Sequence, residues 1–174
     1  GLGAYKYLVS TEKNVQELYE AAHLLDLEFV VASCASFIGT SLSVSNAAGV
    51  FHFAGLFQDT TLQNLARDFV GKHFAQVSRE AEILTLPKDT LAMIIQDDML
   101  QAPENAVFDL VVRWVLVEPE QRRAQFSVLL EYVRLPLMTP LELVDVVESC
   151  PLLIENWGAQ QLLNEAKNYH LLPD

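Results

Sequence analysis

The sequence is poor in cysteine, glycine and basic residues, and each shortage excludes a class of site. The two cysteines, Cys34 and Cys150, form neither a disulfide framework nor a metal-type CxxC pair. The seven glycines are scattered, and no P-loop, G-x-G-x-x-G or G-x-S-x-G motif occurs. Eleven basic residues against 23 acidic ones give a net charge of −12, which disfavours nonspecific binding to nucleic acid or to an anionic membrane surface.

Long apolar runs are also missing. No run reaches the roughly 18–20 residues that span a bilayer, and the start GLGAYKYLVSTEKN lacks the apolar core of a signal peptide. Two thiols outside any framework are typical of a reducing compartment, so we expect a cytoplasmic protein, with the nucleus as an alternative. The chain of 174 residues is long enough to bury a stable core in one or two small domains.

Apolar residues recur at helical spacing along almost the whole chain, so the expected fold class is all-α. The connections are short, and neighbouring helices should therefore pack as antiparallel hairpins. The one strand signal is a possible stub at Tyr5–Val9, and we find no fixed-period repeat that would indicate a regular solenoid. The expected helices are 14–26, 28–40, 45–56, 60–73, 78–84, 87–95, 103–117, 119–133, 139–149 and 156–169.

Capping signals and prolines mark the helix starts. A polar residue followed three positions later by Glu or Gln predicts an N-cap or capping box. Prolines at first-turn positions are tolerated because their missing N–H has no partner there. The capping pairs are Asn14 with Glu17, Thr60 with Gln63 and Thr139 with Glu142, and the first-turn prolines are Pro87, Pro103, Pro119 and Pro140.

Two helices differ in their polar pattern. Helix 103–117 has polar residues only at Asn105, Asp109 and Arg113, a thin stripe that predicts a helix covered on most sides. Asp109 and Arg113 are spaced to form an i,i+4 ion pair. Segment 141–148 places an acidic residue at every third position, which predicts a surface helix with one buried face.

The histidines give no sign of catalysis. His23 has no acidic residue at metal-ligand spacing on its helix face, and His52 and His73 each stand beside a phenylalanine in separate helices. We interpret these three and His170 as structural. An all-helical enzyme or small-ligand carrier remains an alternative, and it would need a cavity lined by converging polar groups around His52 or His73.

The remaining reactive groups also have ordinary interpretations. Asp97 and Asp98 follow an expected helix end and are predicted to shape a turn before Leu100. Cys34 has no nearby cation to lower its pKa, so we expect a buried inert thiol. The residues therefore favour a non-catalytic, acidic, all-helical interaction scaffold with no cofactor or metal.

Several stretches, taken in order, resemble one family. NVQELYEAAHLLDLEFVVASCASFI (14–38) resembles the last two helices of a BTB domain. SVSNAAGVFHFAGLFQDTTLQNLARDFVGKHFAQV (43–77) resembles the helical segment, called the 3-box, that follows the BTB domain in Kelch-like proteins. Segments 86–115, 122–149 and 165–174 resemble the rest of the BACK domain.

The resemblance covers essentially the whole chain and implies a fragment of a longer protein. It implies the C-terminal part of a BTB domain at 1–42 and a complete BACK domain at 43–174, with the 3-box region at 43–77. The implied fold is a BACK-type array of stacked antiparallel helical hairpins after the last BTB helices. Asn46-Ala47-Ala48-Gly49 stands where the family usually has Asn-Cys-x-Gly.

The resemblance also implies a function. Kelch-like proteins typically act as substrate adaptors of cullin-3 RING ubiquitin ligases, in which the BTB domain and the 3-box bind the N-terminal region of cullin-3. The BTB domain dimerises, and BACK links it to a kelch propeller that binds the substrate. The implied partners are therefore cullin-3, a substrate and a second copy of the full-length protein. The alternative is a BTB–BACK–kelch scaffold in cytoskeletal organisation or assembly, without a ligase role.

Four side chains are the candidates that the resemblance implies for the cullin surface. Tyr19 and His23 lie one turn apart on the first helix, and Phe51 and Phe57 lie in the first helix pair of the 3-box region. Exposed aromatic side chains at such positions can anchor a partner helix, whereas the alternative for each phenylalanine is an ordinary core position.

Arg134 interrupts the apolar stretch YVRLPLMTPLELVDVV (132–147). Because Pro136 disfavours a helical conformation at Leu135, the preceding helix should end near Val133. We expect Arg134 to set the angle between two helices, with its guanidinium near the helix C-terminus and Glu131 as its nearest acidic neighbour.

Overall fold

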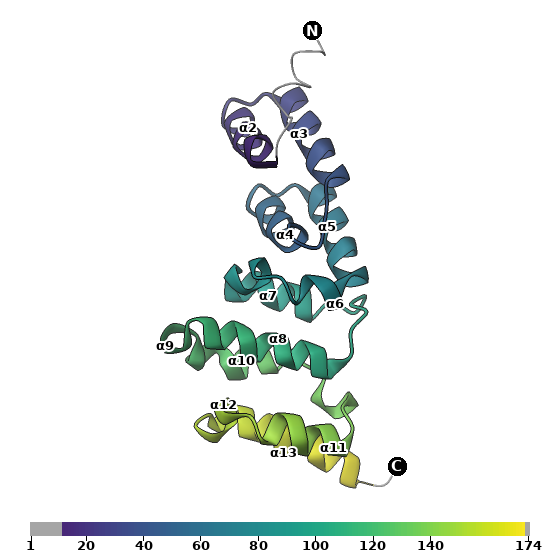
Figure 1. The fold of residues 1–174 in the computed structure, drawn as a ribbon, viewed down its shortest axis with the longest axis vertical. Coiled ribbons are helices and arrows are strands. Elements are labelled where there is room, and N and C mark those ends of the chain that lie inside the picture. Colours follow the sequence, from purple (N-terminus) through teal and green to yellow (C-terminus); the bar gives the residue numbers. More distant parts are fainter. Residues whose placement is uncertain (1–11, 173–174) are drawn as a thin grey trace. The chain divides into compact units, whose positions relative to one another are not determined.

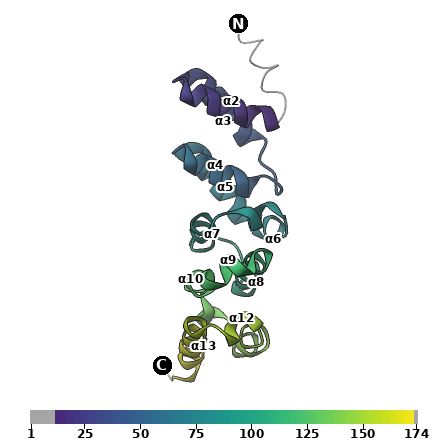
Figure 2. The ribbon, with the colours of Figure 1, turned by 90° about the vertical axis from the view of Figure 1, so that its left-hand side faces the viewer.

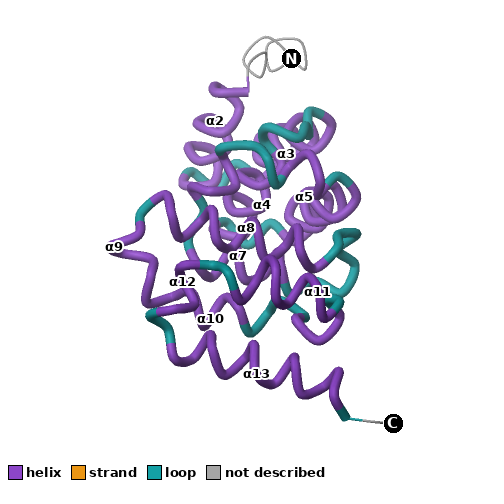
Figure 3. Tube along the Cα trace, turned by 60° about the horizontal axis from the view of Figure 1, so that its bottom comes forward, coloured by secondary structure: helices purple, strands orange, loops and turns teal. Residues whose placement is uncertain are grey.

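The structure is a computed structural model that describes residues 12–172. Within this range it contains helices and loops but no strand, which confirms the predicted all-α class (Figure 3). The expected strand stub Tyr5–Val9 lies outside the described residues. The contacts divide the chain into two compact units between Val70 and Gly71.

Two helical hairpins form the first unit (Figures 1 and 2). The helices are α2 (Glu12–Leu24), α3 (Glu28–Thr40), α4 (Ala47–Leu56) and α5 (Thr60–Lys72), whose last residues extend past the division. In the loop between the hairpins, the Asn46 side chain accepts from the backbone N–H of Ser43 and donates to the carbonyl of Ser41. The predicted helix order is confirmed, although α2 begins at Glu12, so Asn14 lies inside the helix instead of capping it.

The turns within the two hairpins have the same backbone geometry. In the first turn, the N–H of Leu27 donates to the carbonyl of Ala22 at 2.9 Å, and Asp26 has a φ of 55°. In the second turn, Asp59 donates to Ala54 at 2.9 Å, and Gln58 has a φ of 55°. Both are helix ends closed by a single left-handed residue.

The buried positions repeat with the turns. Gln58 follows Asp26 by 32 positions, and six core residues of the first hairpin have buried equivalents at that same offset. The hairpins are therefore two copies of one structural unit, where the sequence analysis found no fixed-period repeat. The shared feature is burial and turn geometry, which tolerate different side chains. The pairs are Val15/Ala47, Tyr19/Phe51, Ala22/Ala54, Val30/Leu62, Cys34/Ala66 and Ile38/Val70.

The cap of α5 differs from the prediction. A carboxylate oxygen of Asp59 accepts from the backbone N–H of Leu62 at 3.0 Å, so Asp59 caps the helix and Thr60 is its first residue. The expected capping box of Thr60 and Gln63 is therefore wrong, because the N-cap lies one residue earlier and Leu62 stands at the third helical position. An Asp before two threonines is an equally good N-cap by composition, and the left-handed turn at Gln58 selects it.

The second unit is built around α8, which contacts η1, α9, η2 and α10. Its buried residues include Phe108, Leu110 and Trp114, and the predicted Asp109–Arg113 ion pair is present at 2.8 Å. The elements are α6 (Phe74–Val77), η1 (Glu82–Thr85), α7 (Lys88–Ile95), α8 (Glu104–Val117), α9 (Pro119–Arg122), η2 (Arg123–Gln125), α10 (Phe126–Leu130), η3 (Leu135–Leu137), α11 (Pro140–Glu142), the π-helix η4 (Leu143–Glu148), α12 (Pro151–Ile154) and α13 (Trp157–Leu171).

Three expected helices of this unit are interrupted. The predicted helix 78–84 is replaced by a turn after α6 and the 3-10 helix η1. Ile83 and Leu86 are both buried, at the three-residue spacing that a 3-10 helix places on one face. The predicted helix 119–133 contains the 3-10 turn η2, and 139–149 widens into the π-helix η4, where Leu143 and Val147 are buried four residues apart.

The prolines fall into two groups. Pro119 and Pro140 occupy the first helical position, as predicted. Pro87 and Pro103 instead stand one residue earlier, as N-caps with extended backbone. The missing N–H is harmless at either position, so composition alone does not separate them.

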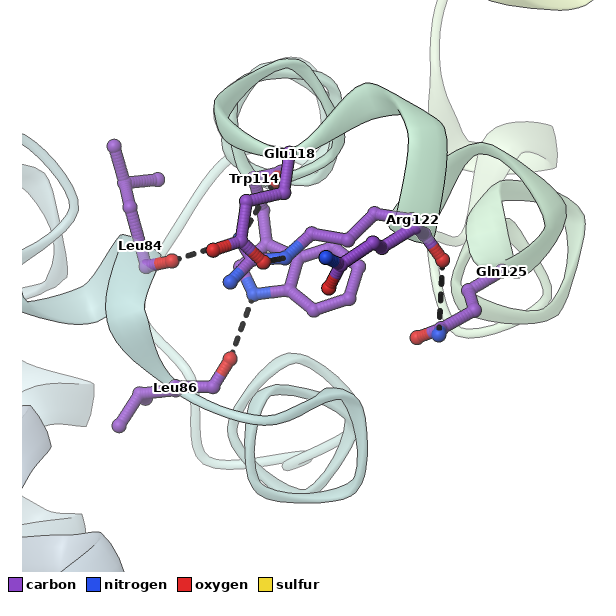
Figure 4. A network of polar contacts seen from close by, with 7 residues as sticks. Leu84, Leu86, Trp114, Glu118, Arg122 and Gln125 are labelled. Atoms are coloured by element: carbon purple, nitrogen blue, oxygen red, sulfur yellow. Dashed lines mark hydrogen bonds and ion pairs between the residues drawn. The ribbon is translucent and has the colours of Figure 1, made fainter.

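A tryptophan and an arginine join three elements of the second unit (Figure 4). Trp114 is 2% exposed, and its indole Nε1 donates to the carbonyl of Leu86 at 2.8 Å. The guanidinium of Arg122 lies over the indole ring at 4.1 Å from its centroid. The same group donates to the carbonyls of Leu84 and Trp114, each at 2.8 Å, and lies 3.3 Å from Glu118. The cluster thereby fixes η1 against α8 and α9.

Arg134 connects distant segments instead of adjacent ones. Its guanidinium lies 2.7 Å from Asp98 and 3.6 Å from Glu104, and its backbone N–H donates to Glu104 at 2.9 Å. Asp97 and Asp98 form the predicted turn, in which Asp97 accepts from the N–H of Met99. Asp98 and Glu104, and not the expected Glu131, are thus the acidic partners, because the chain folds back onto the start of α8.

We expect Arg134→Ala to lower the melting temperature by about 1–4 °C. A surface ion pair contributes up to about 1 kcal/mol, and 1 kcal/mol moves Tm by about 2–4 °C at this chain size. Thermal unfolding followed by circular dichroism measures the shift. Arg123→Ala breaks a more exposed pair with Glu155 and should shift Tm less. An unchanged Tm for Arg134→Ala would contradict the tethering role.

The predicted capping box of Thr139 and Glu142 is present. Glu142 accepts from the backbone N–H of Thr139 at 2.8 Å and from its hydroxyl at 3.0 Å, and the Thr139 hydroxyl accepts from the N–H of Glu142 at 3.2 Å. The other carboxylate oxygen of Glu142 accepts from Asn105 at 3.0 Å. The backbone and hydroxyl bonds from Thr139, with a smaller contribution from Asn105, lower the pKa of Glu142.

This lowered pKa predicts a pH dependence of stability. Because Glu142 binds its proton more weakly in the folded state, its stabilisation is complete above the ordinary glutamate pKa of about 4.3. It is lost as the pH falls through the folded value. Melting temperatures measured from neutral to acidic pH should fall more steeply for the wild type than for Glu142→Gln. Glu131→Gln, at an exposed carboxylate, should retain the wild-type slope, and equal slopes for all three proteins would contradict the prediction.

Candidate functional site

An apolar groove in the first unit is the candidate functional site. It has a volume of about 810 Å³ and runs along α3 and the start of α5. Ala32, Ala35 and Gly39 form part of its lining from α3, and Leu62 and Leu65 line it from α5. We call it the α3–α5 groove. Because α3 offers small side chains, the backbone or a bulky side chain of a partner can approach the helix closely.

The small residues of α3 share one face because they follow helical spacing. Ala32, Ala35, Ser36 and Gly39 recur at intervals of three and four residues. A Cβ at Gly39 would lie 3.1 Å from a methyl carbon of Leu65, so glycine permits the close approach of α3 to α5 at this end. The opposite face of α3 buries Val30, Cys34 and Ile38 in the core.

One end of the α3–α5 groove is acidic. Asp26 and Glu28 line it from the α2–α3 turn and the first residue of α3, and Asp59 lines it from the cap of α5. His23 lies at the same end. The far end, at Gly39 and Thr40, contributes no charged side chain. The groove therefore presents apolar walls with negative charge concentrated at one end.

Tyr19 holds one of these carboxylates in place. Its hydroxyl donates to Asp59 at 2.9 Å, while the other carboxylate oxygen of Asp59 accepts from the N–H of Leu62. Burial, followed by the hydrogen bond to Asp59, raises the pKa of Tyr19. Tyr19 consequently remains a neutral donor, and its hydrogen bond fixes the position of the Asp59 side chain at the end of the groove.

Aromatic rings connect Tyr19 to the groove end. The Phe57 ring lies 5.3 Å from the ring of Tyr19 and 5.1 Å from that of His23, both in edge-on geometry. Phe53 lies 5.0 Å from Tyr19. Such contacts fix the two hairpin turns against each other, and they place the exposed His23 beside the half-buried Phe57.

The four sequence candidates therefore differ in accessibility. Tyr19 is 1% exposed and Phe51 is 3% exposed. The expectation of exposed side chains is wrong for these two, because they occupy equivalent core positions of the repeated hairpins. His23 is exposed and lines the α3–α5 groove, whereas Phe57 does not line it and packs against the His23 ring. A cullin-binding role for any of the four stays a prediction.

Apart from His23, the sequence analysis missed the residues that form the groove. The small face of α3 and the cap Asp59 were not proposed. A stripe of Ala, Ser and Gly at helical spacing was visible in the sequence. The sequence alone does not say which face of α3 packs against the core, so it could not show that this stripe lines a groove.

Cys34, His52 and His73 do not line the α3–α5 groove. Cys34 is free and buried on the core face of α3, as predicted, and burial raises the pKa of its thiol. Between residues 12 and 172 no cluster of His, Cys, Asp and Glu could hold a metal ion. None of the helices in that range combines the length and hydropathy that a bilayer crossing requires.

The sequence is similar to one family model and to curated human proteins. The family model BACK, described as "BTB And C-terminal Kelch", matches residues 47–148. Kelch-like protein 6 of Homo sapiens is 36% identical over 162 residues, which cover 92% of this chain and 26% of that protein. Kelch-like protein 5 of Homo sapiens is 36% identical over 164 residues, which cover 94% and 22%. The chain spans about a quarter of the length of these curated relatives.

Proposed function

Since this chain belongs to the BACK family of Kelch-like proteins, as its sequence resemblance predicted, we propose that it is the helical scaffold of a cullin-3 ubiquitin-ligase adaptor. In this role it binds the N-terminal region of cullin-3 through its first unit. The second unit connects that module to a kelch domain that binds the substrate. The protein catalyses no reaction itself.

The α3–α5 groove is the observation that supports this proposal most strongly. Its α3 side belongs to the range that resembles the end of a BTB domain, and its α5 side belongs to the range that resembles the 3-box. These are the two segments that the family resemblance implies in cullin binding. An apolar groove between them suits a partner segment whose aliphatic side chains enter between two helices.

The other parts of the proposal follow from the same resemblance. Residues 1–42 are assigned to a BTB domain and 43–174 to BACK, and a full-length protein dimerises through the BTB domain. Cys34 and Cys150 are both free and buried, which suits a reducing compartment, so we assign the protein to the cytoplasm or nucleus.

Isothermal titration of the full-length protein with a cullin-3 N-terminal fragment tests the proposal. Saturable binding with one cullin per protein chain is the expected result. No measurable heat with a folded full-length protein would exclude the ligase role. It would leave the cytoskeletal scaffold as the remaining interpretation of the family membership.

A further inference from the structure

The α3–α5 groove carries negative charge as well as an apolar lining, and this charge bears on which partner it binds. Its lining contains three carboxylates, Asp26, Glu28 and Asp59, and no lysine or arginine. All three lie at the end where the two hairpin turns meet. An apolar segment alone would leave these carboxylates without a countercharge as water is displaced around them, and desolvating an unpaired charge is costly.

We propose that the α3–α5 groove selects a partner segment with a lysine or arginine at one end and aliphatic side chains along the rest. The basic residue lies against Asp26, Glu28 and Asp59, and the aliphatic side chains cover Ala32, Ala35 and Leu65. This inference rests on the proposed function, in which the segment is part of the N-terminal region of cullin-3.

The groove dimensions set the length of the segment. Helix α3 has 13 residues and therefore measures about 20 Å at 1.5 Å per residue. An extended strand covers that length with about six residues at 3.3 Å each. The selected segment is therefore short. Its basic residue and its aliphatic residues all lie within the roughly 20 Å length of α3.

The three carboxylates differ in their hydrogen bonds to the rest of the fold. This difference decides which of them can be substituted without destabilising the fold. Asp59 caps α5 and accepts from Tyr19, so its substitution would disturb the fold. Asp26 occupies a left-handed turn position, which asparagine also tolerates. Glu28 is exposed at the first position of α3. Asp26→Asn with Glu28→Gln therefore removes two charges and retains the shape of the groove.

Titrations of the full-length protein with a cullin-3 N-terminal fragment test the selection. The double variant Asp26→Asn, Glu28→Gln should bind about 3- to 20-fold more weakly at low salt, since each exposed ion pair contributes up to about fivefold in affinity. The difference should shrink as salt rises to about 0.5 M, where surface charges are screened. The matched control Glu17→Gln, Glu20→Gln removes two exposed charges of α2 outside the groove and should bind like the wild type at every salt concentration.

The outcomes separate this inference from the proposed function. If the wild type binds and the groove variant binds equally well, or if the control loses as much affinity, charge selection is overturned while cullin binding stands. If the folded wild type fails to bind, the proposed function fails and the inference fails with it. Circular dichroism melting of each variant identifies any loss that comes from unfolding.

Discussion

Trp114→Ala is expected to destabilise the second unit by about 3–5 kcal/mol, the usual cost of deleting a buried large aromatic side chain. The indole is 2% exposed and donates to the Leu86 carbonyl, so its removal leaves a cavity and an unsatisfied acceptor. The Arg122 guanidinium also loses the ring beneath it. Because the net stability of a domain is about 5–15 kcal/mol, this loss approaches the threshold of unfolding.

Urea unfolding followed by far-ultraviolet circular dichroism measures the effect, and the chain supplies its own control. Its other tryptophan, Trp157, is 74% exposed on α13, so Trp157→Ala should cost no more than about 0.5 kcal/mol. Trp114→Phe, which keeps an aromatic ring but loses the N–H donor, should fall between these two. Equal losses for Trp114→Ala and Trp157→Ala would contradict the role assigned to the cluster.

Ala32→Trp is expected to weaken cullin-3 binding by about 30-fold or more, equivalent to the loss of an interface hot spot. Ala32 is exposed on the groove face of α3, so an indole there fills the space in which we propose that the partner segment binds. The core of the first unit should not change, because Cys34 and its neighbours lie on the opposite face. Isothermal titration of the full-length variant with the cullin-3 fragment measures the loss.

Ala21→Trp is the matched control for this substitution. Ala21 is an exposed alanine of α2 that does not line the α3–α5 groove. The control should bind like the wild type, and both variants should retain the wild-type melting temperature to within a few degrees. Undiminished binding by Ala32→Trp would show that the partner does not enter the groove.

The sequence predicted the helices best where apolar periodicity and a strong cap coincide. Thr139 with Glu142 marks the start of α11 correctly because both side chains bond within a single turn. The interruptions after Val77 and Arg122 were missed because they depend on distant contacts. At η1, Ile83 must turn toward the core, and at α9 the Arg122 side chain reaches the carbonyl of Leu84.

The α3–α5 groove runs along helices on which the sequence analysis placed no candidate residue, and of the four predicted site residues only His23 lines it. The rings of Tyr19, His23 and Phe57 contact one another near the hairpin turns. Tyr19 is buried, however, and contributes to the groove only through its hydrogen bond to Asp59. The groove face of α3 consists of residues that lack any chemical signature. Arg134 was taken as a local hinge because Glu131 is near in sequence, whereas Asp98 and Glu104 come close only in the folded chain.

Hydrogen–deuterium exchange of the full-length protein, with and without the cullin-3 N-terminal fragment, tests the central proposal most directly. Binding in the α3–α5 groove predicts slower exchange of backbone amides in 28–40 and 59–65, with little change in 104–117 at the centre of the second unit. Complex formation that leaves 28–40 and 59–65 unprotected, while other segments become protected, would contradict the assignment of the groove.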